Sequence, residues 1–306
     1  MDIQGVYRNR SKVLWLNTEL FLLHGFNHIP ESIGMECLLV PTPWFTRSIQ
    51  TDKRHLSAIT QVERTHQGGQ FLWMVTTNFA NEEALLRLVD GVTAEAGHRG
   101  YFYITASVDQ GSEMFDLFKR VGFTAIDTEQ AWEYQYQETF EEPKNAVWRK
   151  SSPSDISAIN CIQSNLFSPA QKWITPSALK SPPDYTLLID REVQGSAYII
   201  KNNNKAIAIP YYSQSVLFQN QSTTLLLRTL SIITLRLYVL LRGKQLLPES
   251  DLLEGYKKAS DKRIRMIKHI AVMNESLETE YNHVKNGSTG DVLTPLSKTV
   301  EFKDKI

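Results

Sequence analysis

The sequence predicts an α/β protein built from two similar domains in tandem. Its 306 residues are enough for two domains of about 150 residues each. A pattern of strand, helix, glycine–aromatic turn and strand covers residues 101–134, and the same pattern recurs over residues 236–273. Because one pattern returns after about one domain length, we interpret the chain as a weak internal duplication.

The first copy of this pattern is the most clearly marked part of the chain. Aromatic and β-branched residues fill positions 101–108 and predict a strand. Apolar residues then recur at helical spacing from Met114 to Val121. Gly122 stands where a helix takes a left-handed cap, and Phe123 begins the next strand.

In the residues before position 101, the sequence predicts one or two helices followed by strands and a further helix. Leucines at positions 16, 20, 22 and 23 form an apolar face that predicts one or two helices within residues 1–35. Apolar runs predict strands at residues 35–41, 56–62 and 71–77. Asn81 is the expected N-cap of the next helix, and Glu82 and Glu83 follow in its first turn, where carboxylates complement the helix dipole.

An acidic, proline-containing connector at residues 138–147 predicts the domain boundary. We expect a first domain at 1–140, a second at 147–274 and a flexible tail at 275–306, where glycine, serine and scattered charges dominate. The second domain predicts the following elements: strands at 185–190, 196–200, 205–212, 236–241 and 263–273, turns at 193–195 and 202–204, helices at 154–166, 223–233 and 246–253, and an irregular, proline-rich stretch at 168–183.

Composition excludes several classes of function. Basic and acidic residues both number 33, so the formal net charge is zero and neither nucleic acid nor an acidic membrane surface is an expected partner. Cys37 and Cys161 have no metal-ligand spacing, and His24 and His28 lack a third ligand, so we expect no metal. Polar residues interrupt the apolar residues 225–241, so we expect a soluble, cytoplasmic protein rather than a membrane span.

These patterns resemble the GNAT family, the acetyl-CoA-dependent N-acetyltransferases, in a tandem two-domain form. The resemblance covers most of residues 35–274 and is carried by these segments: residues 97–100 (GHRG), 114–123, 238–242 (YVLLR) and 268–272 (KHIAV). It implies an α+β fold in which each domain is a mixed, mostly antiparallel sheet flanked by helices. It also implies a transferase that moves an acetyl group from acetyl-CoA to a small-molecule or protein amine.

In this family the fourth and fifth strands splay apart, and acetyl-CoA enters the gap with its pyrophosphate on a helix N-terminus. The resemblance implies cofactor-binding residues in both domains, namely Val75, Thr76, Thr77 and Asn78 in the first and Ile209, Tyr211, Tyr212, Asn220, Ser222 and Thr223 in the second. Neither helix start has the usual glycines, and the first also carries Glu82 and Glu83. Because carboxylates repel a pyrophosphate, charge favours the second domain.

The catalytic residues are less clearly marked. Family enzymes commonly place a tyrosine four residues before the glycine–aromatic turn, but Phe118 and Asp251 stand there. Candidate bases near predicted strands are Glu36, Glu63 and Asp190. Two functions therefore stay open: an active N-acyltransferase, and a catalytically inactive tandem fold that binds a small molecule or a protein. The sequence leaves the acceptor, the acyl group and the oligomeric state undetermined.

Overall fold

We describe the fold from a computed structural model. The structure describes the following residues: 13–24, 44–50, 56–65, 67–76, 82–135, 142–175, 177–202, 204–216, 219–231, 236–243 and 255–270. Glu36, Thr77, Asn78, Asp251, the helix expected at 246–253 and the tail at 275–306 lie outside them. None of the helices in the described ranges is both long and apolar enough to cross a membrane.

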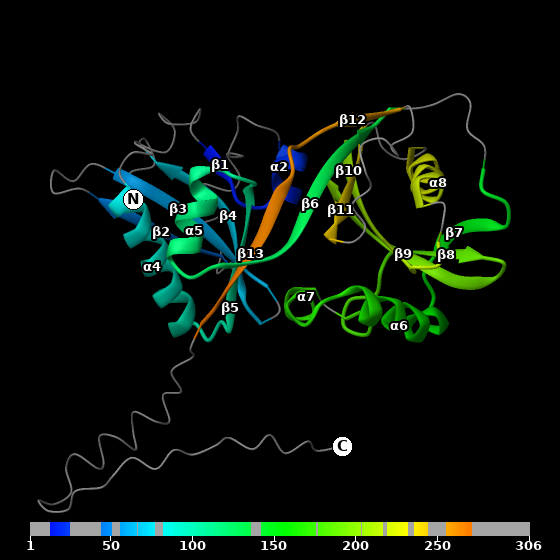
Figure 1. Ribbon diagram of the computed structural model, residues 1–306, viewed down its shortest axis with the longest axis horizontal. Helices are drawn as coiled ribbons and strands as arrows, with labels where there is room; N and C mark the ends of the chain where they lie inside the picture. The colour runs from blue at the N-terminus through cyan, green and yellow to red at the C-terminus, as the bar shows by residue number, and fades with distance from the viewer. Residues whose placement is uncertain are drawn as a thin grey trace, which may run out of the picture.

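In the described part of the chain, thirteen strands form one mixed sheet that runs the length of the molecule (Figure 1). The main path through this sheet has the order β2-β3-β4-β5-β13-β6-β11-β10-β9-β8-β7, while β1 pairs with β4 and β12 pairs with β6. The strands are β1 (Val13–Trp15), β2 (Trp44–Gln50), β3 (Leu56–Arg64), β4 (Gly69–Thr76), β5 (Tyr103–Asp109), β6 (Thr124–Tyr134), β7 (Ala146–Lys150), β8 (Tyr185–Ile189), β9 (Glu192–Asn202), β10 (Lys205–Tyr212), β11 (Arg236–Arg242), β12 (Tyr256–Lys258) and β13 (Arg263–His269).

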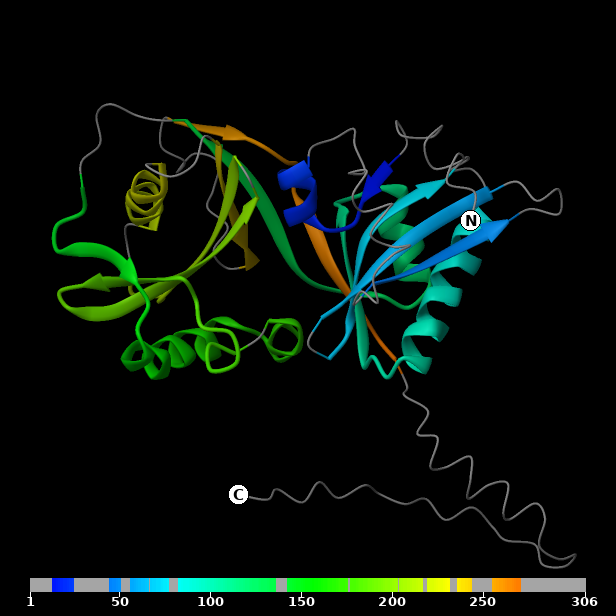
Figure 2. The ribbon, with the colours of Figure 1, turned by 180° about the vertical axis from the view of Figure 1, so that it is seen from behind.

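The two halves of the sheet share their central strands. Strand β13, from the end of the chain, lies between β5 and β6 of the first half, with Arg263 paired to both Asp109 and Glu129. Strand β6 in turn continues into the second half, where it lies between β11 and β12. Figures 1 and 2 show these long strands crossing from one half to the other. Each half is therefore completed by a strand from the other.

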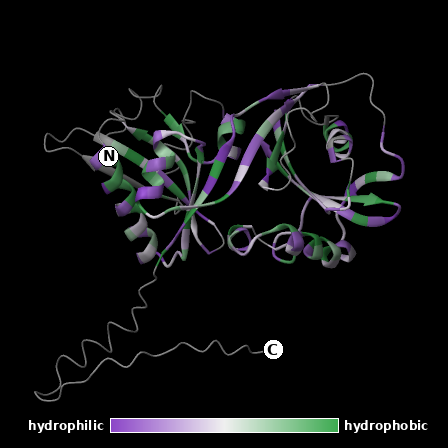
Figure 3. Ribbon diagram, in the orientation of Figure 1, coloured by the Kyte–Doolittle hydropathy of each residue, from purple (hydrophilic) through white to green (hydrophobic). Residues whose placement is uncertain are grey.

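Helices cover both faces of the sheet. They are α2 (Thr18–His24), α4 (Glu82–His98), α5 (Glu113–Arg120), α6 (Ile156–Leu166), α7 (Pro169–Ile174) and α8 (Gln219–Ser231). Helices α4 and α5 are amphipathic, with hydrophobic and hydrophilic residues on each helix (Figure 3). Their apolar residues are buried together in one core of the first half. On β10, Ala208 packs with α8 whereas Ile209 packs with α6, because successive strand residues face opposite sides.

Several local predictions are confirmed. Gly122 and Gly255 have φ angles of 89° and 103° at the two glycine–aromatic turns, a conformation that costs other residues more. The hairpin at residues 202–204 joins β9 to β10 with Asn202 paired to Lys205. Phe118 is fully buried and meets Phe71 and Phe123 edge to face, as a core residue should.

Other local predictions are wrong. The turn expected at 193–195 lies inside β9, and the true turn is at Asp190 and Arg191, which both have positive φ angles. Residues 168–183 include helix α7, which Ser168 and Gln171 cap reciprocally. Residues 13–15 form a strand rather than a helix, because they pair with an open edge of β4. The division at 141–146 stays a prediction, since strands cross between the halves.

Candidate functional site

Each half contains one pair of parallel strands that separates along its length. Strands β4 and β5 pair only at Gly69–Ile104 and Gln70–Thr105, although β4 continues to Thr76 and β5 to Asp109. We call this gap the first fork. Strands β10 and β11 stop pairing after Ala208–Val239, although they continue to Tyr212 and Arg242. This gap is the second fork.

The first fork is filled by the chain itself. Strand β1 pairs antiparallel with the free edge of β4, from Val13 opposite Val75 to Trp15 opposite Trp73. Leu16 then donates its amide to the carbonyl of Leu72 (3.0 Å) and accepts a hydrogen bond at its own carbonyl from the amide of Ser107 on β5 (2.8 Å). The two strands of the first fork are thus joined through an inserted segment rather than to each other.

The second fork opens beside a cavity. Among the described residues, no strand pairs with β10 beyond Ala208 or with β11 beyond Val239 on their facing edges. A cavity of about 270 Å³ is lined by Ile209 and Tyr211 of β10 and by Arg242 of β11. The first half contributes other parts of its wall, including Gln70, Tyr103 and Thr105. The cavity therefore lies where the two halves meet.

The helices that follow the two forks differ in charge at their N-termini. Glu82 and Glu83 begin α4 and pair with Arg120 and Arg87, respectively. Helix α8 has no acidic residue in its first turn. A pyrophosphate fits the neutral helix start better than the acidic one. The two helix starts therefore differ in how well they could hold an anion.

The hydroxyl groups at the start of α8 are used unequally. The Thr223 hydroxyl lies 2.6 Å from the Tyr212 hydroxyl and donates to the carbonyl of Gln219 at 2.8 Å, so it serves the packing of the helix. The Ser222 hydroxyl is buried and has no partner among the described residues. Because Ser222 is 0% exposed and does not line the cavity, its hydroxyl marks no contact with a ligand there.

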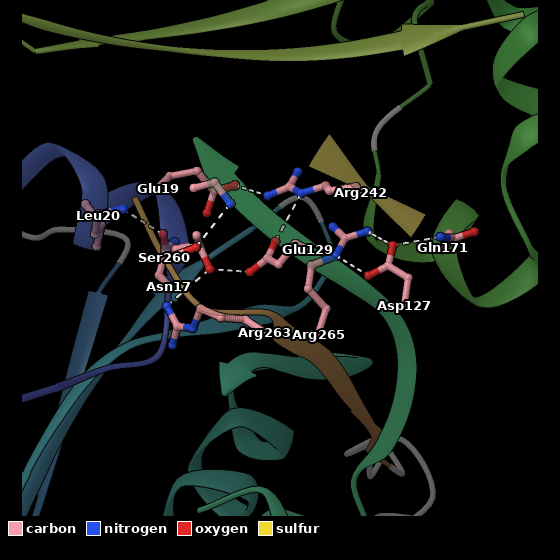
Figure 4. A network of polar contacts seen from close by, with 12 residues as sticks. Asn17, Glu19, Leu20, Asp127, Glu129, Gln171, Arg242, Ser260, Arg263 and Arg265 are labelled. Carbon is pink, nitrogen blue, oxygen red and sulfur yellow. Dashed lines mark hydrogen bonds and ion pairs between the residues drawn. The ribbon is translucent and has the colours of Figure 1, made fainter. Parts of the chain in front are cut away.

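A network of buried charges (Figure 4) lies beside the cavity, and three of its members, Glu19, Arg242 and Arg265, line the cavity. Arg242 pairs with Glu19 of α2 and, at 3.2 Å, with Glu129 of β6, which is fully buried. Burial is the largest influence on the pKa of Glu19 and would raise it, but the charge and hydrogen bond of Arg242, a backbone hydrogen bond and the charge of Arg265 together lower it. This pairing keeps both side chains charged although they are only 12% and 16% exposed.

A second part of the network lies beside the first. Arg265 donates to both carboxylate oxygens of Asp127, at 2.7 and 2.5 Å, and Gln171 of α7 donates to the same carboxylate at 2.7 Å. Burial would raise the pKa of Asp127, but these hydrogen bonds and the charge of Arg265 lower it. Such a bidentate pair fixes the position of Arg265, which lines the cavity.

Tyrosines complete the wall of the cavity. The Tyr198 hydroxyl accepts from Gln163 at 3.0 Å and donates to the carbonyl of Ser181 at 3.1 Å, and the Tyr103 hydroxyl donates to the carbonyl of Trp173. The Tyr211 hydroxyl makes no hydrogen bond with any described residue, while its ring meets Tyr198 edge to face. Tyr211 is 3% exposed, and within the described part of the chain its hydroxyl is not committed to a structural hydrogen bond.

The predicted site residues fall into separate groups. Ile209 and Tyr211 line the cavity. Tyr212 packs in the core beneath α8, and Ser222 and Thr223 are buried residues of α8 itself. Asn220 lies in the first turn of α8. Val75 and Thr76 lie on β4, and Val75 faces β1 across the first fork.

The predicted bases lie elsewhere. Glu63 is on β3, opposite Gln70, and does not line the cavity. Asp190 sits in the exposed β8–β9 turn, where Asn145 donates to it at 2.7 Å. The carboxylate that does line the cavity, Glu19, lies in a stretch that reads as an apolar helix and was missed. Arg242 could have been found from the sequence, because a charged residue at the end of an apolar strand often lies at a functional site.

Comparisons with known proteins give the fold. No family model and no curated protein matches the chain. A GCN5-related N-acetyltransferase from Sphaerobacter thermophilus matches 87% of this chain and 91% of its own, with 11% identity and a TM-score of 0.57.

Two further solved structures are similar. A functionally unknown conserved protein from Staphylococcus epidermidis matches 78% of this chain and 98% of its own, at 8% identity and a TM-score of 0.50. A GCN5-related glucosamine N-acetyltransferase region of a fungal multi-domain GH3 β-N-acetylglucosaminidase matches 87% of this chain and 37% of that chain, at 12% identity and a TM-score of 0.51. The α+β fold class is confirmed, and the chain has the GNAT fold, arranged as two halves in tandem.

Proposed function

We propose that the protein is an N-acyltransferase that takes an acyl group, acetyl in the simplest case, from CoA at the second fork. One observation carries this proposal: β10 and β11 stop pairing after Ala208 and Val239, and the open strand ends lead into the cavity. An acyl-CoA arm with amide groups can use the peptide groups left free there. Acyl-CoA is a cytoplasmic metabolite, so a cytoplasmic location is part of the proposal.

The acceptor is an amine that enters the cavity between the halves. In the reaction the amine nitrogen forms a bond to the thioester carbon, the carbon–sulfur bond breaks, the nitrogen loses a proton and the thiolate gains one. Tyr211 lines the cavity beside the fork, and its hydroxyl has no hydrogen-bond partner among the described residues, so we assign it the donation of a hydrogen bond or a proton. Glu19 and Arg242 face the same cavity as an ion pair, so their charges balance each other there.

A second candidate function is a binding module without catalysis. The filled first fork and the structural use of the Thr223 hydroxyl both favour it. The missing glycines at the start of α8 also favour it, because glycine lets a backbone approach phosphates closely. This alternative predicts that acetyl-CoA or another small molecule binds and that no product forms.

A thiol-release assay separates the two functions. Acetyl-CoA is mixed with the protein and a panel of small amines and lysine peptides, and free CoA thiol and the acetylated product are both measured. We expect amine-dependent thiol release, lowered at least about tenfold by Tyr211→Phe. Tyr185→Phe, on β8 and away from the cavity, is the matched control and should leave the rate unchanged.

The outcomes are distinct. If calorimetry detects binding of acetyl-CoA but no amine releases thiol, the binding module is the better account. If neither binding nor thiol release is found, the transferase proposal is wrong. If Tyr211→Phe and Tyr185→Phe behave alike in an active enzyme, the role given to Tyr211 is wrong.

A further inference from the structure

We infer that strand β1 occupies the place of an acyl-CoA arm in the first fork, so that each chain binds one acyl-CoA, at the second fork. This inference rests on the proposed function for the second fork and adds what the first half does. It concerns residues 13–16, which lie between β4 and β5 where those strands do not pair.

The inserted segment uses the same peptide groups that a ligand would need. Its backbone pairs with the edge of β4 over three residues, and Leu16 bonds to Leu72 on one side and Ser107 on the other. An extended arm with two amides, such as the pantetheine part of CoA, would bond to those edges in a similar way. Both cannot occupy the fork at once.

The segment is also firmly held. Trp15 and Leu16 are 4% and 0% exposed, so their removal would expose a large apolar surface. Arg263 of β13, itself buried, donates from one nitrogen to the carbonyls of Trp15 and Ser107, both at 2.5 Å. One guanidinium thus joins the inserted strand to β5, and charge-assisted bonds of this kind are stronger than neutral ones.

The same segment reaches the second fork. After Leu16 the chain enters α2, where Asn17 caps the helix by accepting from the amide of Leu20 at 2.9 Å. Two residues on, Glu19 pairs with Arg242 at the cavity, and Lys205 of β10 donates to the carbonyl of Leu22 at 3.1 Å. The segment that fills the first fork therefore also holds α2 in position, and α2 places Glu19 at the cavity between the halves.

The first experiment measures stoichiometry and location together. The full chain is titrated with acetyl-CoA by calorimetry, and hydrogen exchange of the free and saturated protein is followed by mass spectrometry. We expect one acetyl-CoA per chain, with new protection in peptides covering residues 209–216 and 239–242 and none in peptides covering residues 71–76 of β4, which do not line the cavity. Two acetyl-CoA per chain, or new protection in the first-fork peptides, would overturn the inference while leaving the transferase proposal intact.

The second experiment works without any ligand. The Ser107 amide, which donates to Leu16, should exchange slowly in the free protein, and Leu16→Ala should speed its exchange by roughly tenfold or more relative to the global rate. Leu22→Ala, a buried leucine of α2 outside the fork, is the matched control. Fast exchange of Ser107 in the unaltered chain would overturn the inference. If no acetyl-CoA binds at all, both the proposed function and the expected ratio of one acetyl-CoA per chain are wrong.

Discussion

Replacing Glu129 by glutamine tests the buried charge network beside the cavity. Glu129 is fully buried, accepts from the Thr18 hydroxyl and pairs with Arg242 at 3.2 Å. Arg263 lies close to the same carboxylate, since Glu129 is the main group that opposes the burial-driven fall in the pKa of Arg263. Loss of the negative charge would leave Arg242 and Arg263 buried with less compensation.

The expected magnitude follows from this burial. Removing one partner of a buried ion pair costs about 3–5 kcal/mol, because the remaining charge stays desolvated. For a chain of 306 residues each kcal/mol lowers the melting temperature by about 1.5 °C, so Glu129→Gln should lower it by roughly 5–8 °C. Urea denaturation followed by circular dichroism gives the free energy of unfolding, and calorimetry gives the melting temperature.

The matched control is Glu83→Gln on α4. Glu83 pairs with Arg87 one helical turn away, but the two side chains are 74% and 69% exposed. An exposed pair of this spacing contributes within about 0.5 kcal/mol. If Glu129→Gln unfolds with the same free energy as Glu83→Gln, the buried pairing of Glu129 with Arg242 does not stabilise the fold.

Three further changes test other parts of the fold. Since the pKa of Asp127 is lowered on folding, its carboxylate stabilises the chain above the ordinary pKa of 3.8 and loses this effect as pH falls toward the folded pKa; Asp127→Asn should therefore cost stability at pH 7 and progressively less below pH 3.8 in urea titrations across pH. Phe118→Ala should cost about 3–5 kcal/mol by urea denaturation, because it leaves a cavity between Phe71 and Phe123; a cost below about 1 kcal/mol would contradict its place in the core. Gly122→Ala should cost about 1–2 kcal/mol through its positive φ angle alone, and an unchanged unfolding midpoint would show that the turn is relaxed.

Local structure followed from the sequence where one short pattern decides it. The β5–α5–β6 unit was predictable because helical spacing, the Gly122 cap and the following strand all agree. The β9–β10 hairpin was predictable from its asparagines. In each case the residues that determine the element are neighbours in the chain, so pairing partners at long range change little.

Long-range pairing could not be predicted in the same way. Strand β13 reads as the last strand of the second half, yet it pairs with β5 and β6 of the first. From their local pattern, residues 13–15 are expected to be helical. They form a strand because they pair with the open edge of β4, which lies about sixty residues further along the chain and leaves no mark on the local sequence. An apolar segment takes the secondary structure that its tertiary partner offers, and no local pattern records that partner.

The candidate site was only partly predictable for the same reason. Ile209 and Tyr211 followed from the family resemblance, since they lie on the strand that opens. Glu19 and Arg265 come from distant parts of the chain and meet at the cavity only after the halves exchange strands. Neither residue stands in a motif, so the sequence pointed instead to Glu63 and Asp190, which do not line the cavity.

The crystal structure of the protein grown with saturating CoA tests the central claim most directly. We predict ligand density between β10 and β11, beyond Ala208 and Val239, with the nucleotide near the start of α8 and β1 still seated in the first fork. Density for CoA between β4 and β5 with residues 13–16 displaced, or a second fork that stays empty at saturation, would contradict the account.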